Sequence, residues 1–261
     1  MKMNELPKWM TLTGKKGLIL GLANEHSIAW GCTQLFQSQG AKLVTTCLND
    51  KARAWVEPLT QPLGVPLLSC NIEEPGSLQK AVDEAIGQLG SLDFVVHSIA
   101  WAPLEDLHGR VTDSSSTGFA RAMEVSCHSF ATLAKLCAPH MNRGGSLITM
   151  SYLGADEVVP HYGLMGPVKA ALESLVRYMA AELGPQNIRV HAVSPGPVLT
   201  RAASGIAGFD ELMKSALEKS PLQRLVTLEE IAHLCHFLCS DASSGMTGQT
   251  LYVDAGCHAM A

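Results

Sequence analysis

The sequence has few charged residues, and its basic residues form no block. Charged residues make up 16% of the 261 residues, hydrophobic residues make up 47%, and the formal net charge is −5. A surface that binds nucleic acid or an anionic membrane needs clustered Lys and Arg, so the composition argues against both partners. It instead predicts a compact globule of a length that suits one α/β domain.

Long hydrophobic runs are also missing. No uninterrupted apolar stretch reaches the about 20 residues that a membrane-spanning helix needs. Residues 1–10 lack the extended apolar segment of a secretory signal peptide. We therefore expect a cytoplasmic protein.

Cysteine is present, but not in a pattern that forms a disulfide framework. The eight cysteines are scattered along the chain, so we expect them to be reduced and to pack in the core. His233, Cys235, His236 and Cys239 form the single metal-like cluster, and no second ligand pair follows at zinc-finger spacing. We expect these four to pack as one helix face and to bind no metal.

Tyrosine is scarce, and half of it lies in one region. Of four tyrosines, Tyr152 and Tyr162 follow the strand-like run 146–150, and Lys169 comes seven residues after Tyr162. A tyrosine near a lysine can stabilise or protonate a developing oxyanion, because an ammonium group favours the ionised phenol. A tyrosine at a strand end and a lysine on a solvated helix face is the alternative interpretation of this pattern.

Short apolar runs alternate with helix-period stretches along the whole chain. This alternation predicts a seven-stranded parallel sheet with helices on both faces, a single Rossmann-like doubly wound α/β domain over 1–261. The predicted strands are 17–20, 42–47, 65–70, 93–97, 146–150, 189–193 and 250–253. The predicted helices include 28–39, 78–89, 119–140, 168–183 and 228–239.

The usual G-x-G-x-x-G loop is absent where a dinucleotide would meet the first strand. The stretch 21–31 reads GLANEHSIAWG, in which Gly21 allows a tight turn and Ser27 supplies a hydroxyl group. The N–H groups of the helix that starts at Ile28 are suited to a pyrophosphate. An ordinary βα turn without a ligand remains the alternative.

The end of the second strand leaves the choice of dinucleotide open. A carboxylate there favours the ribose of NADH, whereas a basic residue favours the 2′-phosphate of NADPH. Asp50 comes late in this segment, and Lys51 and Arg53 follow it.

Taken together, these stretches resemble the divergent short-chain dehydrogenase/reductases, and most closely the NADH-dependent bacterial enoyl-acyl-carrier-protein reductases. The resemblance covers nearly the whole chain. It rests on GLANEHSIAWG (21–31), HSIA (97–100), SYLGA (151–155), the Tyr162–Lys169 spacing, SPGPVLT (194–200), AASGI (202–206) and LCSD (238–241).

The spacing of tyrosine and lysine separates this group from ordinary short-chain dehydrogenases, which have Tyr-x3-Lys. Seven residues return to nearly the same helix face about 10.5 Å further along the axis, and the position four residues before Lys169 is Met165. Because Pro167 fits best in a first turn, we expect the regular helix to begin after Tyr162.

The resemblance implies a reaction and a role for each residue. Hydride from NADH would reach the β-carbon of a trans-2-enoyl thioester of fatty acid synthesis, and Tyr162 would stabilise the resulting enolate. Lys169 would bind the nicotinamide ribose, and Tyr152 would line the pocket or relay a proton. The expected cofactor contacts are Gly21, Ser27, Ile28, Leu48, Asn71, Ile72, Ile99, Lys169, Val198 and Thr200. The expected substrate contacts are Ala100, Trp101, Ala102, Tyr152, Tyr162, Met165 and Ile206.

Some positions depart from the family pattern. Asn71 occupies a position where Asp is common. Ala100 occupies a position where Gly is common, and its added methyl group predicts a narrower pocket beside the nicotinamide. Arg201 could pair with a phosphate or a carboxylate, or face solvent. The stretch 199–222, with two glycines and a short amphipathic helix, is expected to form a substrate lid, although an ordinary crossover is the alternative.

The resemblance further implies acyl-carrier protein as the substrate carrier and a homotetramer. NADPH as cofactor is not excluded. A short-chain dehydrogenase/reductase acting on another hydrophobic carbonyl or enoyl substrate is the second interpretation. A dinucleotide-binding sensor or scaffold without catalysis is the third, and the paired tyrosines and the lysine argue against it.

Overall fold

The computed structural model describes residues 7–141, 144–201, 203–206 and 208–260. A seven-stranded sheet in the order β3-β2-β1-β4-β5-β6-β7 forms its centre, and every neighbouring pair of strands is parallel. The strands are β1 (Lys16–Leu20), β2 (Lys42–Cys47), β3 (Leu67–Ser69), β4 (Phe94–His97), β5 (Gly145–Met150), β6 (Ile188–Pro195) and β7 (Gln249–Val253). The predicted doubly wound α/β sheet is confirmed.

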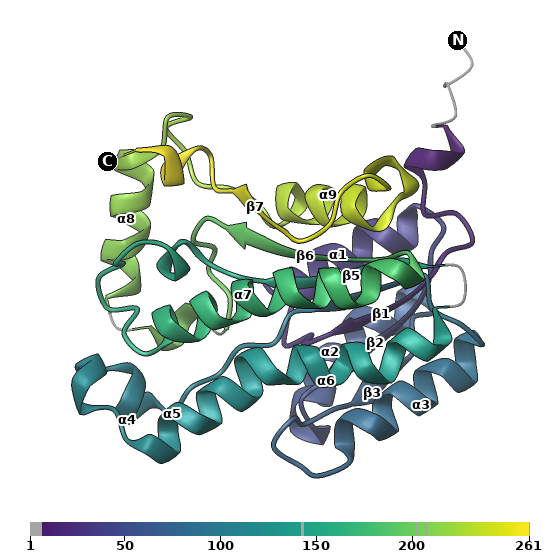
Figure 1. The fold of residues 1–261 in the computed structure, drawn as a ribbon, viewed down its shortest axis with the longest axis horizontal. Coiled ribbons are helices and arrows are strands. Elements are labelled where there is room, and N and C mark those ends of the chain that lie inside the picture. Colours follow the sequence, from purple (N-terminus) through teal and green to yellow (C-terminus); the bar gives the residue numbers. More distant parts are fainter. Residues whose placement is uncertain (1–6, 142–143, 202, 207, 261) are drawn as a thin grey trace.

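Helices cover both faces of this sheet (Figure 1). Successive side chains of a strand point to opposite faces, so Leu18 and Leu20 of β1 join one apolar core and Ile19 joins the other. The first core is closed by α3 (Ser77–Leu89), α6 (Ser129–Cys137) and α7 (Met165–Leu183). The second is closed by α1 (Ile28–Ser38), α2 (Asp50–Thr60) and α9 (Leu228–Cys239).

Helix α2 was not among the predicted helices. It buries a narrow stripe, which is Ala52, Val56 and Thr60, and it contains Pro58. Both features weaken the helix-period signal in the sequence. The Asn49 side chain caps the helix by accepting a hydrogen bond from Ala52 N at 3.0 Å.

The predicted helix over 119–140 is confirmed, but it contains a π-helical turn that the sequence did not indicate. The structure has α5 (Ser116–Met123), a π-helical turn over Glu124–His128, and then α6. A π-helical turn re-aims the side chains that follow it. Here it directs Ser126 toward Trp101 and Ser129 toward His97.

Helix α7 begins at Met165, with Pro167 in its first turn. The prediction that the regular helix starts after Tyr162 is therefore confirmed. The strand predicted at 65–70 is shorter than expected, because Val65 N donates to Thr60 O at 3.2 Å and closes the preceding turn instead of joining the ladder.

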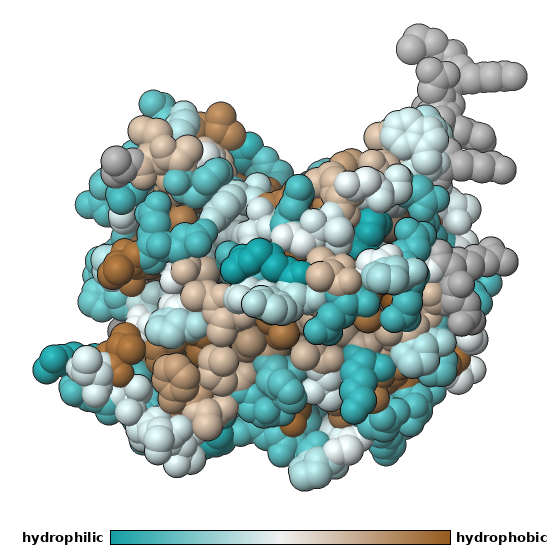
Figure 2. Space-filling model, viewed as in Figure 1, coloured by the Kyte–Doolittle hydropathy of each residue, from teal (hydrophilic) through white to brown (hydrophobic). Residues whose placement is uncertain are grey.

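The carboxyl end of the sheet carries two further short helices, α4 (Leu104–Leu107) and α8 (Phe209–Lys219). On the face in Figure 2, hydrophilic and hydrophobic side chains are intermixed, and the outline is notched between the α8 corner and the α9 corner. Over the described residues, no helix has both the length and the apolar character that a membrane crossing needs.

All eight cysteines are free and buried, as expected. In α9, Cys235 and Cys239 lie in the core, whereas His233 is half exposed beside Glu229. Among the described residues no group of three or more His, Cys, Asp and Glu is arranged to hold a metal ion.

Candidate active site

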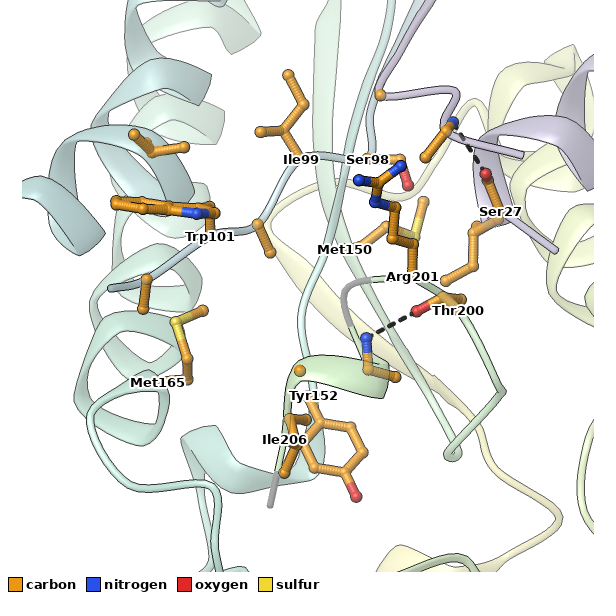
Figure 3. Close-up of a pocket in the computed structure, with 18 of the residues that line it drawn as sticks. Ser27, Ser98, Ile99, Trp101, Met150, Tyr152, Met165, Thr200, Arg201 and Ile206 are labelled. Atoms are coloured by element: carbon orange, nitrogen blue, oxygen red, sulfur yellow. Dashed lines mark hydrogen bonds between the residues drawn. The ribbon is translucent and has the colours of Figure 1, made fainter. Parts of the chain in front are cut away.

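A cavity of about 720 Å³ opens where the carboxyl ends of the strands meet the loops that follow them. In an open parallel sheet this edge is where ligands bind. Every residue expected to contact cofactor or substrate lines this one cavity, and Figure 3 labels some of them, including Ser27, Trp101 and Tyr152. The expected residues are Gly21, Ser27, Ile28, Leu48, Asn71, Ile72, Ile99, Ala100, Trp101, Ala102, Tyr152, Tyr162, Met165, Lys169, Val198, Thr200 and Ile206.

The two tyrosines are packed against each other within the cavity. Tyr152 follows β5, Tyr162 precedes α7, and their ring centroids are 4.8 Å apart at an interplanar angle of 55°. A Cβ atom on Gly154 would lie 2.3 Å from Cδ1 of Tyr162. The Tyr162 ring can therefore take this position only because residue 154 has no side chain.

Burial, followed by the neighbouring Tyr152 and Glu173, raises the pKa of Tyr162. Burial also raises the pKa of Tyr152, with Cys257 and Asp254 adding to the effect. For both tyrosines burial, which favours the neutral phenol, is the largest effect on the pKa. Both phenols are protonated at neutral pH, so each can donate a hydrogen bond.

Lys169 is buried rather than placed on a solvated helix face, and 3% of it is exposed. Its Nζ donates to the backbone oxygen of Met150 at 2.6 Å. Burial lowers the pKa of Lys169 to about 8, while Cys127 and Glu173 act in the opposite direction. A buried amine with one protein partner has further N–H bonds to give to a ligand.

Glu173 lies one turn after Lys169 and was not singled out in the sequence. It accepts a short hydrogen bond from the Ser151 hydroxyl group. Lys169 and Glu173 thus bind the consecutive residues Met150 and Ser151, which fixes the end of β5 just before Tyr152. Because i and i+4 share a helix face, the sequence held a signal for this pair that we missed.

Beneath the site, His97 at the end of β4 is fully buried. Its Nδ1 and Nε2 lie 3.0 Å from Thr149 Oγ1 and 2.9 Å from Ser129 Oγ. Burial, with the nearby Lys169 charge, lowers the pKa of His97 to about 3. The imidazole is therefore neutral and joins α6 to the strand ends that support Lys169.

The turn between β1 and α1 forms one end of the cavity. Gly21 has φ +94°, and a Cβ there would lie 2.1 Å from Ser98 O. The Ser27 hydroxyl accepts from Ala23 N at 3.0 Å and Asn24 N at 2.9 Å, and it donates to Asn24 O at 2.7 Å. The first of these bonds is drawn in Figure 3.

In this structure the Ser27 hydroxyl group is engaged within its own turn, and its contact with the cofactor stays a prediction. The donors at this point are the N–H groups of Ile28 and Ala29, because the hydrogen bonds within α1 begin with Trp30 N to Ser27 O at 2.9 Å.

The ends of β2 and β3 form the far end of the cavity, where Leu48, Asn71 and Ile72 lie. Asn71 Nδ2 donates to Glu74 Oε1 at 3.0 Å, and Asn71 Oδ1 accepts from Glu73 N at 3.2 Å.

Asp50 and Arg53 turn away from this end and are not among the residues that line the cavity. The two are paired at 3.8 Å, and Arg53 also donates to Leu67 O at 2.9 Å. Of the described residues that do line it, Lys169 and Arg201 are the basic ones.

The other end of the cavity is apolar. In Figure 3, Trp101 and Met165 lie on one side of the open space, and Tyr152 and Ile206 lie on the other. Further apolar residues also line this end, namely Leu104, Leu107, Val125, Phe209 and Leu212. Phe209 and Leu212 lie on α8, within the stretch expected to form the lid, whereas Leu104 and Leu107 lie on α4, which is too short for periodicity to identify a buried face.

The segment expected to be a lid borders this apolar end. Ala203, Gly205 and the first half of α8 line the cavity. Thr200 Oγ1 accepts from Ala203 N at 3.1 Å (Figure 3), and His108 Nε2 lies 2.7 Å from Gly205 O. Ala202 and Ala207, also part of the predicted lid, lie outside the described residues.

A doubly wound parallel sheet with a tight glycine turn after β1 and a buried tyrosine and lysine after β5 is typical of a dinucleotide-dependent oxidoreductase. A family model described as enoyl-(acyl carrier protein) reductase matches residues 21–258. The chain belongs to this enoyl-(acyl carrier protein) reductase family.

Individual relatives match over nearly their full length. "Enoyl-[acyl-carrier-protein] reductase [NADH] 1" of Rhizobium meliloti is 42% identical over 95% of this chain and 91% of that protein. A Nostoc protein, also named an enoyl-[acyl-carrier-protein] reductase [NADH], is 43% identical over 95% of this chain and 97% of its own.

Solved structures agree with these matches. The enoyl-[acyl-carrier-protein] reductase (NADH) of Aquifex aeolicus has a TM-score of 0.92 at 40% identity, covering 95% of this chain and 98% of that one. The reductase of Anaplasma phagocytophilum, solved in complex with NAD, has a TM-score of 0.91 at 42% identity, covering 95% of each chain.

Proposed function

We propose that this protein reduces the carbon–carbon double bond of a trans-2-enoyl-acyl-carrier-protein with NADH, in fatty acid synthesis. The observation that carries the proposal is the buried, protonated Tyr162 in a cavity that also contains Lys169 and an apolar acyl end. The relatives are named NADH-dependent enoyl-acyl-carrier-protein reductases, and this activity fits the site.

The residues present fit NADH, which supplies the hydride when bound. The turn at Gly21 brings backbone close to the cavity, and the N–H groups of Ile28 and Ala29 suit the pyrophosphate. Asn71 and Ile72 would contact adenine, Ile99 the adenosine side, and the Val198 backbone the carboxamide, with Thr200 near the phosphates. The described lining at the end of β2, Cys47 and Leu48, has no basic residue for a 2′-phosphate, which favours NADH over NADPH.

Lys169 would donate hydrogen bonds to the nicotinamide ribose. The bond to Met150 O fixes the position of the Lys169 amine, so the amine would already be oriented when the ribose binds. Its charge also supplies positive potential close to where negative charge develops.

Tyr162 would hydrogen-bond the thioester oxygen. Hydride addition at the β-carbon places negative charge on that oxygen, which gives an enolate. A protonated phenol held by ring packing stabilises this charge without reorganising. Tyr152, whose ring packs against Tyr162 at a tilt, would orient the acyl chain or relay a proton.

Two other activities fit the site less well. Reduction of a carbonyl by an ordinary short-chain dehydrogenase needs Tyr-x3-Lys, and Met165 occupies the tyrosine position here. A sensor or scaffold needs no oxyanion stabiliser, yet both tyrosines and the lysine lie together in the cavity.

Acyl-carrier protein is the proposed carrier of the substrate. The homotetramer and the cytoplasmic location remain predictions of the family resemblance. Arg201 lines the cavity next to Thr200, and pairing with a phosphate remains a proposal for it.

The proposed function is tested by steady-state rates with NADH and with NADPH against enoyl thioesters of increasing chain length. We expect NADH oxidation with these substrates and a higher kcat/KM with NADH than with NADPH. A protein that binds NADH but oxidises it with no enoyl thioester of any length would refute the proposed activity.

A further inference from the structure

Three side chains from distant parts of the sequence form a connected series, and the first and last of them, Glu73 and Trp101, line the cavity. Glu73 follows β3 at the adenine end, Trp101 follows β4 at the acyl end, and Arg121 lies on α5. Arg121 Nε and Nη2 both donate to Glu73 Oε1, at 3.0 and 2.6 Å. The Arg121 Cζ atom lies 4.7 Å from the centroid of the Trp101 ring.

Each end of this connection is attached to a residue that lines the cavity. At the adenine end, Glu73 N donates to the Asn71 side chain at 3.2 Å. At the acyl end, Trp101 N donates to Ser126 Oγ, which in turn donates to Trp101 O, both at 2.8 Å. The backbone of Trp101 is thus fixed, and the position of its indole depends on what packs against the ring.

Arg121 is the group that packs there. A guanidinium over an indole face is attracted by the ring quadrupole, and the planar group stacks with a defined orientation. The pairing of Arg121 with Glu73 is half exposed, so it adds little stability to the fold by itself. Its two donors to one oxygen nevertheless fix where the guanidinium lies.

We propose that Glu73, Arg121 and Trp101 couple the two ends of the cavity, so that NADH or NAD⁺ at the adenine end strengthens acyl binding against Trp101. The proposal rests on the proposed function, because it takes adenine to bind at Asn71 and the acyl chain to bind at Trp101. Arg121 is a positioning residue in this scheme and touches neither ligand.

The physical basis is a series of contacts that starts at one turn. A ligand bound at Asn71 restrains residues 71–73, and with them the Glu73 carboxylate that holds the guanidinium over Trp101. The indole ring is then held in place before the acyl chain binds. Acyl binding therefore costs less conformational entropy of the protein. Coupling between two binding sites is reciprocal, so the acyl ligand must strengthen dinucleotide binding by the same factor.

The test measures the dissociation constant of a saturated acyl thioester, octanoyl-coenzyme A, without and with saturating NAD⁺. Neither ligand reacts with the other at a measurable rate, so the ratio of the two constants is the coupling. For the unmodified protein we expect a ratio of about five or more. In Arg121→Gln and in Glu73→Gln the ratio falls toward one, and the double variant loses no more than Arg121→Gln alone.

Arg110→Gln is the matched control. Arg110 is also an exposed arginine paired with a carboxylate, but its partner is Asp113 at 3.9 Å, whereas Arg121 contacts Glu73 and Trp101. Arg110→Gln should leave the ratio unchanged. In turnover, Arg121→Gln should raise the KM for an enoyl thioester about fivefold and leave kcat within twofold, whereas loss of folded protein would lower activity at every substrate concentration.

A ratio of one in the unmodified protein, or an undiminished ratio in both Arg121→Gln and Glu73→Gln, would overturn the coupling while the enzyme remained an active reductase. Failure of the proposed function differs from this result, because the unmodified protein would then not oxidise NADH with any enoyl thioester. That outcome would also refute the proposed coupling, because the coupling rests on the proposed function.

Discussion

The two ends of the cavity are built from different parts of the protein. The phosphate end consists of backbone, which includes the turn at Gly21 and the first N–H groups of α1, held in place by the Ser27 hydroxyl. The acyl end consists of side chains, such as Trp101, Met165 and Ile206, on loops and short helices. Because backbone geometry is set by the fold, we expect the first end to recognise groups that all dinucleotides share, and we expect single substitutions at the second end to change the substrate.

Among these changes, we expect the loss of the Tyr162 hydroxyl group to have the largest effect on activity. Tyr162→Phe keeps the ring that packs on Tyr152 but removes the hydroxyl group. We expect kcat/KM for an enoyl thioester to fall about 100- to 1000-fold, with the dissociation constant of NADH changed less than threefold. Tyr178→Phe is the control, since Tyr178 lies exposed on α7; equal turnover in the two variants would remove Tyr162 from the site.

Breaking the backbone-built end should come next in size. Gly21→Ala introduces a Cβ 2.1 Å from Ser98 O at a positive φ, so the turn must shift. We expect the dissociation constant of NADH to rise about 100-fold, because the strained conformation is displaced together with the N–H groups.

Gly87→Ala provides the comparison for this change. Gly87 lies inside α3, and a Cβ there meets nothing within 4 Å. NADH affinity should be unchanged, and stability should rise by about 0.5–1 kcal/mol. Tight NADH binding by Gly21→Ala would contradict the proposed placement of the pyrophosphate.

The charge of Lys169 should make NADH binding depend on pH. Burial lowers its pKa to about 8 from 10.5, so the amine is charged below pH 8 and loses its proton above it. We expect the dissociation constant of NADH to rise about tenfold between pH 7.5 and pH 9.5. Lys169→Arg, which does not titrate in this range, should remove the dependence.

The same shift has a consequence for stability. Between about pH 8 and 10.5 the unfolded chain binds more protons at this lysine than the folded protein does, so the free energy of unfolding rises with pH there. Denaturant titrations should show this rise in the unmodified protein relative to Lys169→Met. A difference between the two that falls as pH rises would contradict the buried ammonium group.

The smallest effect is expected at the acyl end. Ala100 lines the cavity between Ile99 and Trp101, and Ala100→Gly removes one methyl group. Flat aromatic inhibitors that stack beside the nicotinamide should bind about threefold more tightly to the variant, since a methyl group changes binding by a modest factor. Equal inhibition of both proteins would refute the idea of a narrower pocket.

The sequence was sufficient to predict the fold because each strand is a short buried apolar run between helix-period stretches. Where local signals were weak, prediction failed. Helix α2 contains Pro58 and buries a narrow stripe, and the helix-period pattern did not indicate the π-helical turn at Glu124–His128 within the predicted helix.

The residues of the site were identified by the motifs that resemble a family, and their position around one cavity agrees with that. The engagement of the Ser27 hydroxyl within its own turn could not be foreseen, because it depends on backbone geometry. The contacts of Arg121 with Glu73 and Trp101 could not be foreseen either, because they join residues 48 and 20 positions away along the chain.

The central claim is that this tyrosine–lysine pair serves enoyl rather than carbonyl reduction. The most direct test compares NADH oxidation by the unmodified protein with a trans-2-enoyl thioester and with the 3-oxoacyl thioester of the same length and carrier. The account predicts a kcat/KM at least 100-fold higher for the enoyl substrate. Equal or greater activity with the 3-oxoacyl substrate would contradict it.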